Sequence, residues 1–182
     1  TLALRQPGSS IKPINYAVGL IRGYTGATTF VDQPICFPTN DGKKYCPVNY
    51  DGKFNGVMQM RFALGNSINI PAIKMLKVNT VEDMIATASA MGITTFSEPE
   101  KYGLSLTLGG GEVKMTELAT AFGVFANAGT RKDLTSILKV EDSSGKILEE
   151  NKEVIVWNKK AKHSLLDING SRVLPFEIAY LI

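Results

Sequence analysis

The segment at residues 5–13, RQPGSSIKP, restricts the fold of this chain more than any other stretch. It contains a Pro-Gly turn, after which apolar residues recur at helical spacing. A helix is predicted from about Ser9 to about Ile21, in which Pro13 is tolerated because it falls in the first turn. Lys12 then lies one turn after Ser9 on the same face, where its amine can reach the hydroxyl. This spacing suits a serine acyl-enzyme with lysine as the base.

The Ser-x-x-Lys spacing is weak on its own, because the chain contains it twice more, at Ser136 and Lys139 and at Ser143 and Lys146. Only the copy that begins at Ser9 follows a Pro-Gly turn and enters a helical pattern. The other two fall in a predicted strand and in a hairpin turn. Context therefore favours the first copy.

Turn residues and apolar spacing predict the remaining elements. A long, partly hairpin connection is expected over residues 27–56, where turn signals concentrate and periodicity is weak. The elements expected after it are a helical stretch at 57–64, a helix from about Asn69, a helix at 81–91 capped by Asn79 or Thr80, a largely buried helix at 117–127 with Thr116 as N-cap, a β-hairpin within 135–150 and a helix over 175–182.

Composition excludes several classes of protein. With 182 residues, 44% of them hydrophobic, the chain can bury a core as one domain. The net charge of +3 is small and the basic stretch at 159–163 has no interleaved aromatics, so no nucleic-acid partner is expected. No apolar run reaches the roughly 18 residues needed to span a bilayer, and no signal-peptide pattern opens the chain. Membrane contact is expected only through regions outside these residues.

The residues offer little to a metal or a cofactor. His163 is the only histidine, which excludes Ser-His-Asp chemistry unless it lies beside Ser9, and no His/Cys cluster suggests a metal. The glycines at 109–111 are not followed by Lys-Ser/Thr and form no GxGxxG pattern, so we interpret them as a turn before a helix and not as a nucleotide site. No cofactor is expected, and lysine is the remaining candidate base.

Two cysteines, Cys36 and Cys46, flank a turn-rich stretch that a hairpin could fold back on itself. They form either a disulfide, which requires an oxidising compartment, or two unpaired thiols. Spacing alone does not decide between these alternatives.

Ser67-Ile68-Asn69 is the only Ser-x-Asn in the chain and lies at a predicted junction between two helices. A hydroxyl there can pass a proton between a lysine and a leaving group, and the carboxamide offers a donor and an acceptor to a peptide. The alternative is that Ser67 or Asn69 caps the helix that begins near Pro71.

Four blocks, in this order, carry a resemblance: RQPGSSIKP at 5–13, NYDGKFNG at 49–56, ALGNSINIPAIKML at 63–76 and LTLGGGEVKMTELATAFGVFANAGT at 106–130. Together they resemble the transpeptidase domain of class A penicillin-binding proteins over nearly the whole chain. The resemblance implies an α/β fold of the serine β-lactamase and D,D-transpeptidase kind, with mostly the helical part, a hairpin and little of the central antiparallel sheet.

The resemblance also implies a function, peptidoglycan D,D-transpeptidation on stem peptides that end in D-Ala-D-Ala, with β-lactam antibiotics acylating the same serine. Ser9 matches the nucleophile, Lys12 its base, Ser67 the proton-relay serine and Asn69 the substrate-binding asparagine. The implied location is extracytoplasmic, in the periplasm or on the outer face of the bacterial cytoplasmic membrane. No metal is implied.

One departure is the absence of the family's third motif, Lys-Thr/Ser-Gly, from the 182 residues. Residues 1–182 are therefore expected to be a partial transpeptidase domain, without that strand, the glycosyltransferase domain or the membrane anchor, and to be inactive alone. Two other readings stay open: a catalytically silent scaffolding module in cell-wall assembly, and a serine β-lactamase. No block resembles the deacylating glutamate loop of a β-lactamase.

Overall fold

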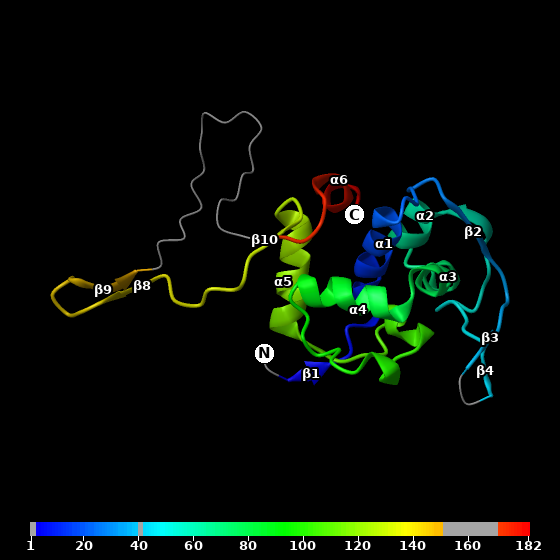
Figure 1. Ribbon diagram of the computed structural model, residues 1–182, viewed down its shortest axis with the longest axis horizontal. Helices are drawn as coiled ribbons and strands as arrows, with labels where there is room; N and C mark the ends of the chain where they lie inside the picture. The colour runs from blue at the N-terminus through cyan, green and yellow to red at the C-terminus, as the bar shows by residue number, and fades with distance from the viewer. Residues whose placement is uncertain (1–2, 40–41, 151–170) are drawn as a thin grey trace.

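The structure, a computed structural model, describes residues 3–39, 42–150 and 171–182. Figure 1 shows a body of helices gathered around α1 (Lys12–Ile21), from which the hairpin of β8 (Lys139–Glu141) and β9 (Ile147–Glu150) projects to one side. The other described helices are α2 (Met60–Gly65), α3 (Asn69–Asn79), α4 (Val81–Ala90), α5 (Met115–Ala126) and α6 (Phe176–Leu181), with the 3₁₀ helices η1 (Gly8–Ile11), η2 (Pro99–Lys101) and η3 (Leu104–Leu108).

The strands pair antiparallel in twos. The remaining strands are β1 (Leu4–Arg5), β2 (Thr29–Asp32), β3 (Phe37–Pro38), β4 (Lys44–Tyr45), β5 (Gly56–Gln59), β6 (Val113–Lys114), β7 (Thr130–Arg131) and β10 (Ser171–Arg172). The pairs are β1 with β6, β2 with β5, β3 with β4, β7 with β10 and β8 with β9. The described part of the chain is thus mixed α/β and mostly helical, as predicted, and its sheets have two strands each.

Helix α1 is the axis of the core, because both clusters of buried apolar side chains include it. Ile14 and Ala17 pack toward α4 and α5, whereas Tyr16 and Leu20 pack toward α2, α3 and β2. A helix that is apolar on nearly every face is stable only when it is enclosed by other elements. Polar side chains at the start of α1 are consequently drawn away from water.

Cys36 and Cys46 form a disulfide, which settles the alternative that the sequence leaves open. The bond closes the small hairpin of β3 and β4. Phe37 in that hairpin is buried, and the Lys77 amine of α3 lies 5.3 Å from the centre of its ring, a cation–π contact. The disulfide loop is thereby held against α3.

Several predicted elements are confirmed. The helix predicted from Ser9 is present, with η1 as its first turn and Pro13 at the start of α1. The helices from Asn69 and at 81–91 are confirmed, and Thr80 caps the second, its side chain accepting a hydrogen bond from the Asp83 N–H. The hairpin within 135–150 and the final helix are also present.

Two predictions on the helices at 57–64 and 117–127 are wrong in part. Residues 57–59 belong to strand β5, because pairing with β2, about 30 residues earlier in the chain, overrides their helical spacing. Helix α5 begins at Met115 after Lys114, so Thr116 is not its N-cap. This helix is less buried than predicted, since Phe122 is 41% exposed.

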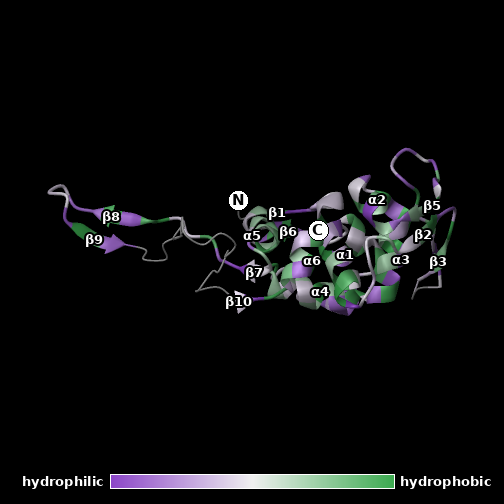
Figure 2. Ribbon diagram, turned by 90° about the horizontal axis from the view of Figure 1, so that it is seen from above, coloured by the Kyte–Doolittle hydropathy of each residue, from purple (hydrophilic) through white to green (hydrophobic). Residues whose placement is uncertain are grey.

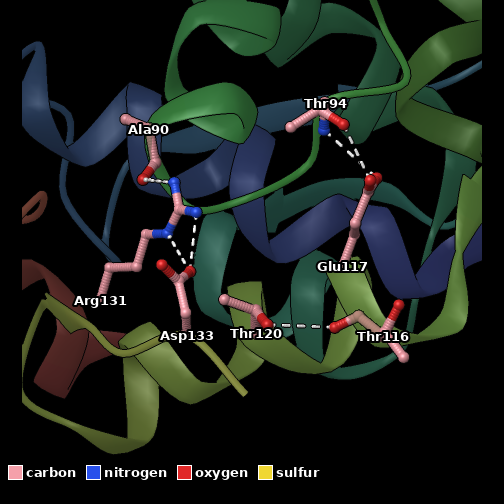
Figure 3. A network of polar contacts seen from close by, with 7 residues as sticks. All are labelled: Ala90, Thr94, Thr116, Glu117, Thr120, Arg131 and Asp133. Atoms are coloured by element: carbon pink, nitrogen blue, oxygen red, sulfur yellow. Dashed lines mark hydrogen bonds and ion pairs between the residues drawn. The ribbon is translucent and has the colours of Figure 1, made fainter. Parts of the chain in front are cut away.

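Polar side chains attach the end of α4 to β7 and the loop after α4 to α5 (Figure 3). Arg131 donates to the Asp133 carboxylate from Nε at 2.9 Å and from Nη2 at 2.7 Å, and to the Ala90 carbonyl from Nη1 at 3.4 Å. The Glu117 carboxylate accepts hydrogen bonds from the Thr94 N–H at 3.2 Å and the Thr94 hydroxyl at 2.8 Å. These contacts lie largely at the surface, where they position the loop.

The projecting hairpin of β8 and β9 is more exposed than the helical body. Figure 2 shows hydrophilic and hydrophobic residues interspersed along it, and all four residues of β9 are exposed. The basic stretch at 159–163, with His163, lies outside the described residues. Among the helices that the structure describes, none is both long and apolar enough to cross a membrane.

Candidate active site

Lys12 is the first residue of α1, and its side chain is almost completely buried, with a residue exposure of 1%. The amine donates three hydrogen bonds: to the Ser67 carbonyl at 2.6 Å, the Ser67 hydroxyl at 3.1 Å and the Asn69 Oδ1 at 2.8 Å. An ammonium has three donors, so these oxygens use all of them. The structure therefore brings three of the four predicted site residues into direct contact.

The electrostatic surroundings of Lys12 are unusual for a lysine. Within the described ranges, no carboxylate forms an ion pair with it, and all three acceptors are neutral oxygens. Burial lowers the pKa of the amine from 10.5 to about 8, because removing water disfavours the charged form. The neutral amine is therefore accessible closer to neutral pH than it is for a lysine in water. A neutral amine can accept a proton.

Ser67 lies in the turn between α2 and α3 with a φ of 55°, in the left-handed region. Its N–H donates to the Leu64 carbonyl at 2.9 Å and the Ile68 N–H to the Ala63 carbonyl at 2.9 Å, the pattern of a Schellman motif that ends α2. Glycine usually occupies this position, and other residues are strained there by about 1–2 kcal/mol. The strained turn aims both the hydroxyl and the carbonyl of Ser67 at Lys12.

Neither Ser67 nor Asn69 caps α3, so the structure contradicts that alternative. The N-cap position is Ile68, which makes no side-chain cap bond. The Asn49 Oδ1 supplies the cap from a distant segment, accepting from the Asn69 N–H at 2.9 Å and, less closely, from the Ile70 N–H at 3.4 Å. The Asn69 side chain is left to accept from Lys12 and to donate to the Val48 carbonyl at 2.9 Å.

Ser9 lies in η1, and its carbonyl accepts the Lys12 N–H. Side chains three residues apart eclipse one another in a 3₁₀ turn, so Ser9 and Lys12 lie on the same side of it. The Ser9 residue is exposed, and its hydroxyl has no hydrogen-bond partner among the residues that the structure describes. An exposed hydroxyl with no partner is open to a substrate.

The turn that carries Ser9 rests on the backbone of the glycine-rich loop. Gly8 has a φ of 58°, and a Cβ added at Gly109 would lie 2.3 Å from the Gly8 nitrogen. No side chain fits between these two backbones, so Gly109 shapes the serine turn. The glycines at 109–111 thus have a structural role, as predicted.

The other two Ser-x-x-Lys copies have no comparable surroundings. Lys139 and Lys146 are exposed residues of the projecting hairpin, and Lys139 pairs with the Glu141 carboxylate. Neither lysine is buried among neutral oxygens as Lys12 is.

Sequence reasoning missed two buried polar residues beside the site, Asn49 and Asp32. Asn49 stands at the start of the block at 49–56, which was its only signal. Asp32 lies in a turn-rich stretch without a motif. In the described part of the chain, no cluster of His, Cys, Asp or Glu could hold a metal ion.

Taken together, the arrangement supplies the parts of nucleophilic acyl transfer. An exposed serine hydroxyl stands one turn from a buried lysine with a lowered pKa, and a second hydroxyl touches the lysine amine. A lysine activated by desolvation can act as the base for a serine nucleophile.

Comparison with curated proteins finds penicillin-binding proteins 1A among the relatives of this chain. No protein-family model matches the chain. Penicillin-binding protein 1A of Aquifex aeolicus is 38% identical over 151 residues, which are 82% of this chain and 20% of that protein. Penicillin-binding protein 1A of Neisseria lactamica is 36% identical over 149 residues, 81% of this chain and 18% of that protein. The chain thus spans about a fifth of the length of these relatives.

Solved structures of penicillin-binding proteins are also similar to this chain. Penicillin-binding protein 1A from Haemophilus influenzae matches with a TM-score of 0.82 and 27% identity, over 100% of this chain and 29% of that one. The PonA1 protein from Mycobacterium tuberculosis in complex with penicillin V matches with a TM-score of 0.75 over 98% of this chain and 45% of that one. At 19% identity, the second match speaks for the fold alone.

Proposed function

The chain is a partial homologue of the class A penicillin-binding proteins, and we propose that residues 1–182 form part of a transpeptidase domain that cross-links peptidoglycan through an acyl-serine intermediate. The observation that carries the proposal is the Lys12 amine, buried without a carboxylate and bonded to Ser67 and Asn69. A buried amine that is not paired with a carboxylate can accept a proton, as a general base must.

In the first step, the Ser9 Oγ attacks the carbonyl carbon between the two D-Ala residues of a stem peptide. The hydroxyl proton passes to the neutral Lys12 amine as the C–O bond forms. The amide C–N bond then breaks, and the leaving D-Ala nitrogen receives a proton from Lys12 through the Ser67 hydroxyl, which lies 3.1 Å from the amine. The products are free D-Ala and an ester on Ser9.

In the second step, the amine of another stem peptide attacks that ester. Lys12, neutral again after the first step, takes up the amine proton and passes it to the Ser9 oxygen as the ester C–O bond breaks, which returns the Ser9 hydroxyl and the neutral amine. A new amide links the two peptides. Net, one amide bond is exchanged for another, so neither an oxidant nor a metal is needed.

We assign Asn69 to substrate binding. Its Oδ1 accepts from Lys12, and one of its two amide hydrogens goes to the Val48 carbonyl. The remaining N–H can donate a hydrogen bond to a carbonyl of the peptide substrate. The same residue would then hold the lysine and the substrate in one geometry.

β-Lactam antibiotics fit the same scheme, because Ser9 would open the lactam C–N bond and keep the acyl group. An extracytoplasmic location also fits, since disulfides such as that of Cys36 and Cys46 form and persist in oxidising compartments.

A labelling experiment with fluorescent penicillin tests the proposal. It uses the full-length gene product that contains these residues, with Ser9→Ala and the decoy control Ser136→Ala. We expect stoichiometric labelling of the wild type and the control, none of Ser9→Ala, and the label on the Ser9 peptide in mass spectrometry. The 182-residue chain alone is expected to remain unlabelled.

Each other outcome selects a different reading. An unlabelled full-length protein would favour the catalytically silent scaffold. Label that is released within seconds would favour a β-lactamase, whereas slow release together with cross-linking of D-Ala-D-Ala stem peptides would favour the transpeptidase. Label that survives Ser9→Ala would refute the assignment of the nucleophile.

A further inference from the structure

Asp32 is a buried carboxylate that the proposed chemistry does not use. It lies at the end of β2 with an exposure of 1%. Its Oδ2 accepts from the Asn55 N–H at 2.8 Å and the Asn55 Nδ2 at 2.8 Å, and both carboxylate oxygens accept from the Asn49 Nδ2, at 2.9 and 2.8 Å. Every contact is to a neutral amide. A buried carboxylate is costly unless such donors surround it.

Asn49 connects this carboxylate to the candidate site. It is 3% exposed, and besides Asp32 its Nδ2 donates to the Lys53 carbonyl at 2.8 Å. Its Oδ1 accepts from the Asn69 N–H at 2.9 Å, and the neighbouring Val48 carbonyl accepts from the Asn69 side chain at 2.9 Å. Residues 48 and 49 therefore hold Asn69 by its backbone and by its side chain.

The carboxylate decides which way the Asn49 amide points. A carboxylate only accepts hydrogen bonds, so it binds the amide nitrogen and turns the amide oxygen toward α3. The first N–H groups of a helix have no partner within the helix, and the Asn49 oxygen accepts from two of them, those of Asn69 and Ile70. If the amide were reversed, an N–H would face the Asn69 N–H and the cap would be lost.

We infer that Asp32 and Asn49 are positioning residues of the acylation reaction, which hold the Ser67-Ile68-Asn69 turn at hydrogen-bonding distance from Lys12. The inference rests on the proposed function. Neither residue touches substrate, and both act through Asn69. Shifting the turn by about 1 Å would separate the relay hydroxyl and the carboxamide from the lysine amine, and a misplacement of that size can cost about a hundredfold in rate.

The test measures penicillin acylation of the full-length protein by stopped flow, separating the limiting acylation rate from the concentration for half-saturation. For Asp32→Asn and Asn49→Ala we expect the limiting rate to fall about tenfold to a hundredfold with little change in half-saturation. Asp51→Asn is the matched control, because Asp51 is an exposed carboxylate of the same loop, bonded to the Lys53 N–H at 3.0 Å. It should acylate at the wild-type rate.

Exchanging the side chains at positions 32 and 49 should partly restore the acylation rate, which a general loss of stability would not do. Asn49→Asp places two carboxylates side by side and should slow acylation strongly. Adding Asp32→Asn to it restores the donor–acceptor pair between positions 32 and 49 and keeps an oxygen toward α3. The Lys53 carbonyl stays without its donor, so the double variant should recover about tenfold over Asn49→Asp alone and remain slower than the wild type. Thermal unfolding of each variant identifies any that are not folded.

The outcomes separate the two proposals. If the wild type is not acylated at Ser9, the proposed function itself fails. If the wild type is acylated and the folded Asp32→Asn and Asn49→Ala variants match Asp51→Asn, the positioning role is overturned. A double variant no faster than Asn49→Asp would also overturn it.

Discussion

Two lysines at the starts of two helices meet opposite surroundings. Lys12, the first residue of α1, is buried and bonds neutral oxygens, and its pKa is lowered to about 8. Lys114 precedes α5, is 36% exposed and pairs with the Glu117 carboxylate at 2.9 Å. The difference teaches that position on a helix does not make a lysine reactive. Burial without a carboxylate lowers the pKa of the amine, because it disfavours the charged form.

The largest difference between Lys12 and Lys114 is expected when the amine of each is removed. Lys12→Met keeps the length of the side chain but removes the base, so acylation of the full-length protein should fall about 10²–10⁴-fold. Lys114→Met should leave the rate within about twofold, since its amine serves only a partly buried ion pair with Glu117, on another helix than Lys12. Fluorescent penicillin labelling over time measures both. Equal losses in the two variants would show that the lysines do not differ in function.

The strained turn that faces Lys12 allows a second test. Ser67→Gly removes the hydroxyl and relieves the left-handed backbone, so acylation should fall about a hundredfold while the free energy of unfolding rises by about 1 kcal/mol. Ser67→Ala loses the same hydroxyl but keeps the strain. Acylation rates and chemical denaturation compare the two variants. If glycine is no more stable than alanine, the turn is not strained.

The pH dependence of acylation should sharpen the comparison further. Because burial lowers the pKa of Lys12 to about 8, the rate should rise about tenfold per pH unit below that value and level off above it, as the amine loses its proton. Lys114→Met should give the same profile. The measurement is the acylation rate between pH 6 and 9.5. A flat profile would exclude Lys12 as the base.

The smallest effect, on the free energy of unfolding, is expected for the ion pair of Lys114 and Glu117. Burial raises the pKa of Glu117, but hydrogen bonds from Lys114 and Thr94 outweigh it and leave the pKa below its usual value. The paired carboxylate thus stabilises the fold above the unfolded-state pKa, and the effect is lost as pH falls through the lower folded-state pKa. Glu117→Gln should cost under about 1 kcal/mol at pH 7 and less at pH 3, with acylation unchanged. Denaturation at both pH values checks this.

The features that the sequence predicted correctly depend mostly on residues that are close together along the chain. The helix that begins near Ser9 and the junction at Ser67 and Asn69 follow from turn residues and apolar spacing within a few positions of each site residue. The approach of Lys12 to these residues depends on the packing of α1 against α3, which only the resemblance to known transpeptidases suggested.

Non-local pairing accounts for most of what the sequence missed. Asp32 and Asn49 read as ordinary loop residues, because their burial arises only when β2, the disulfide loop and α3 come together. The strand at 56–59 has the same origin, since its partner lies far away in the chain. Propensity describes neighbours along the chain, whereas these features depend on neighbours in space.

The contact between Gly8 and Gly109 has a kinetic consequence. The two glycines stand roughly a hundred residues apart, and their backbones meet with no room for a side chain between them. Closing a loop of that length is a slow, late event compared with forming helices. Ser9 is therefore expected to acquire its geometry late in folding, when the glycine loop docks against the serine turn.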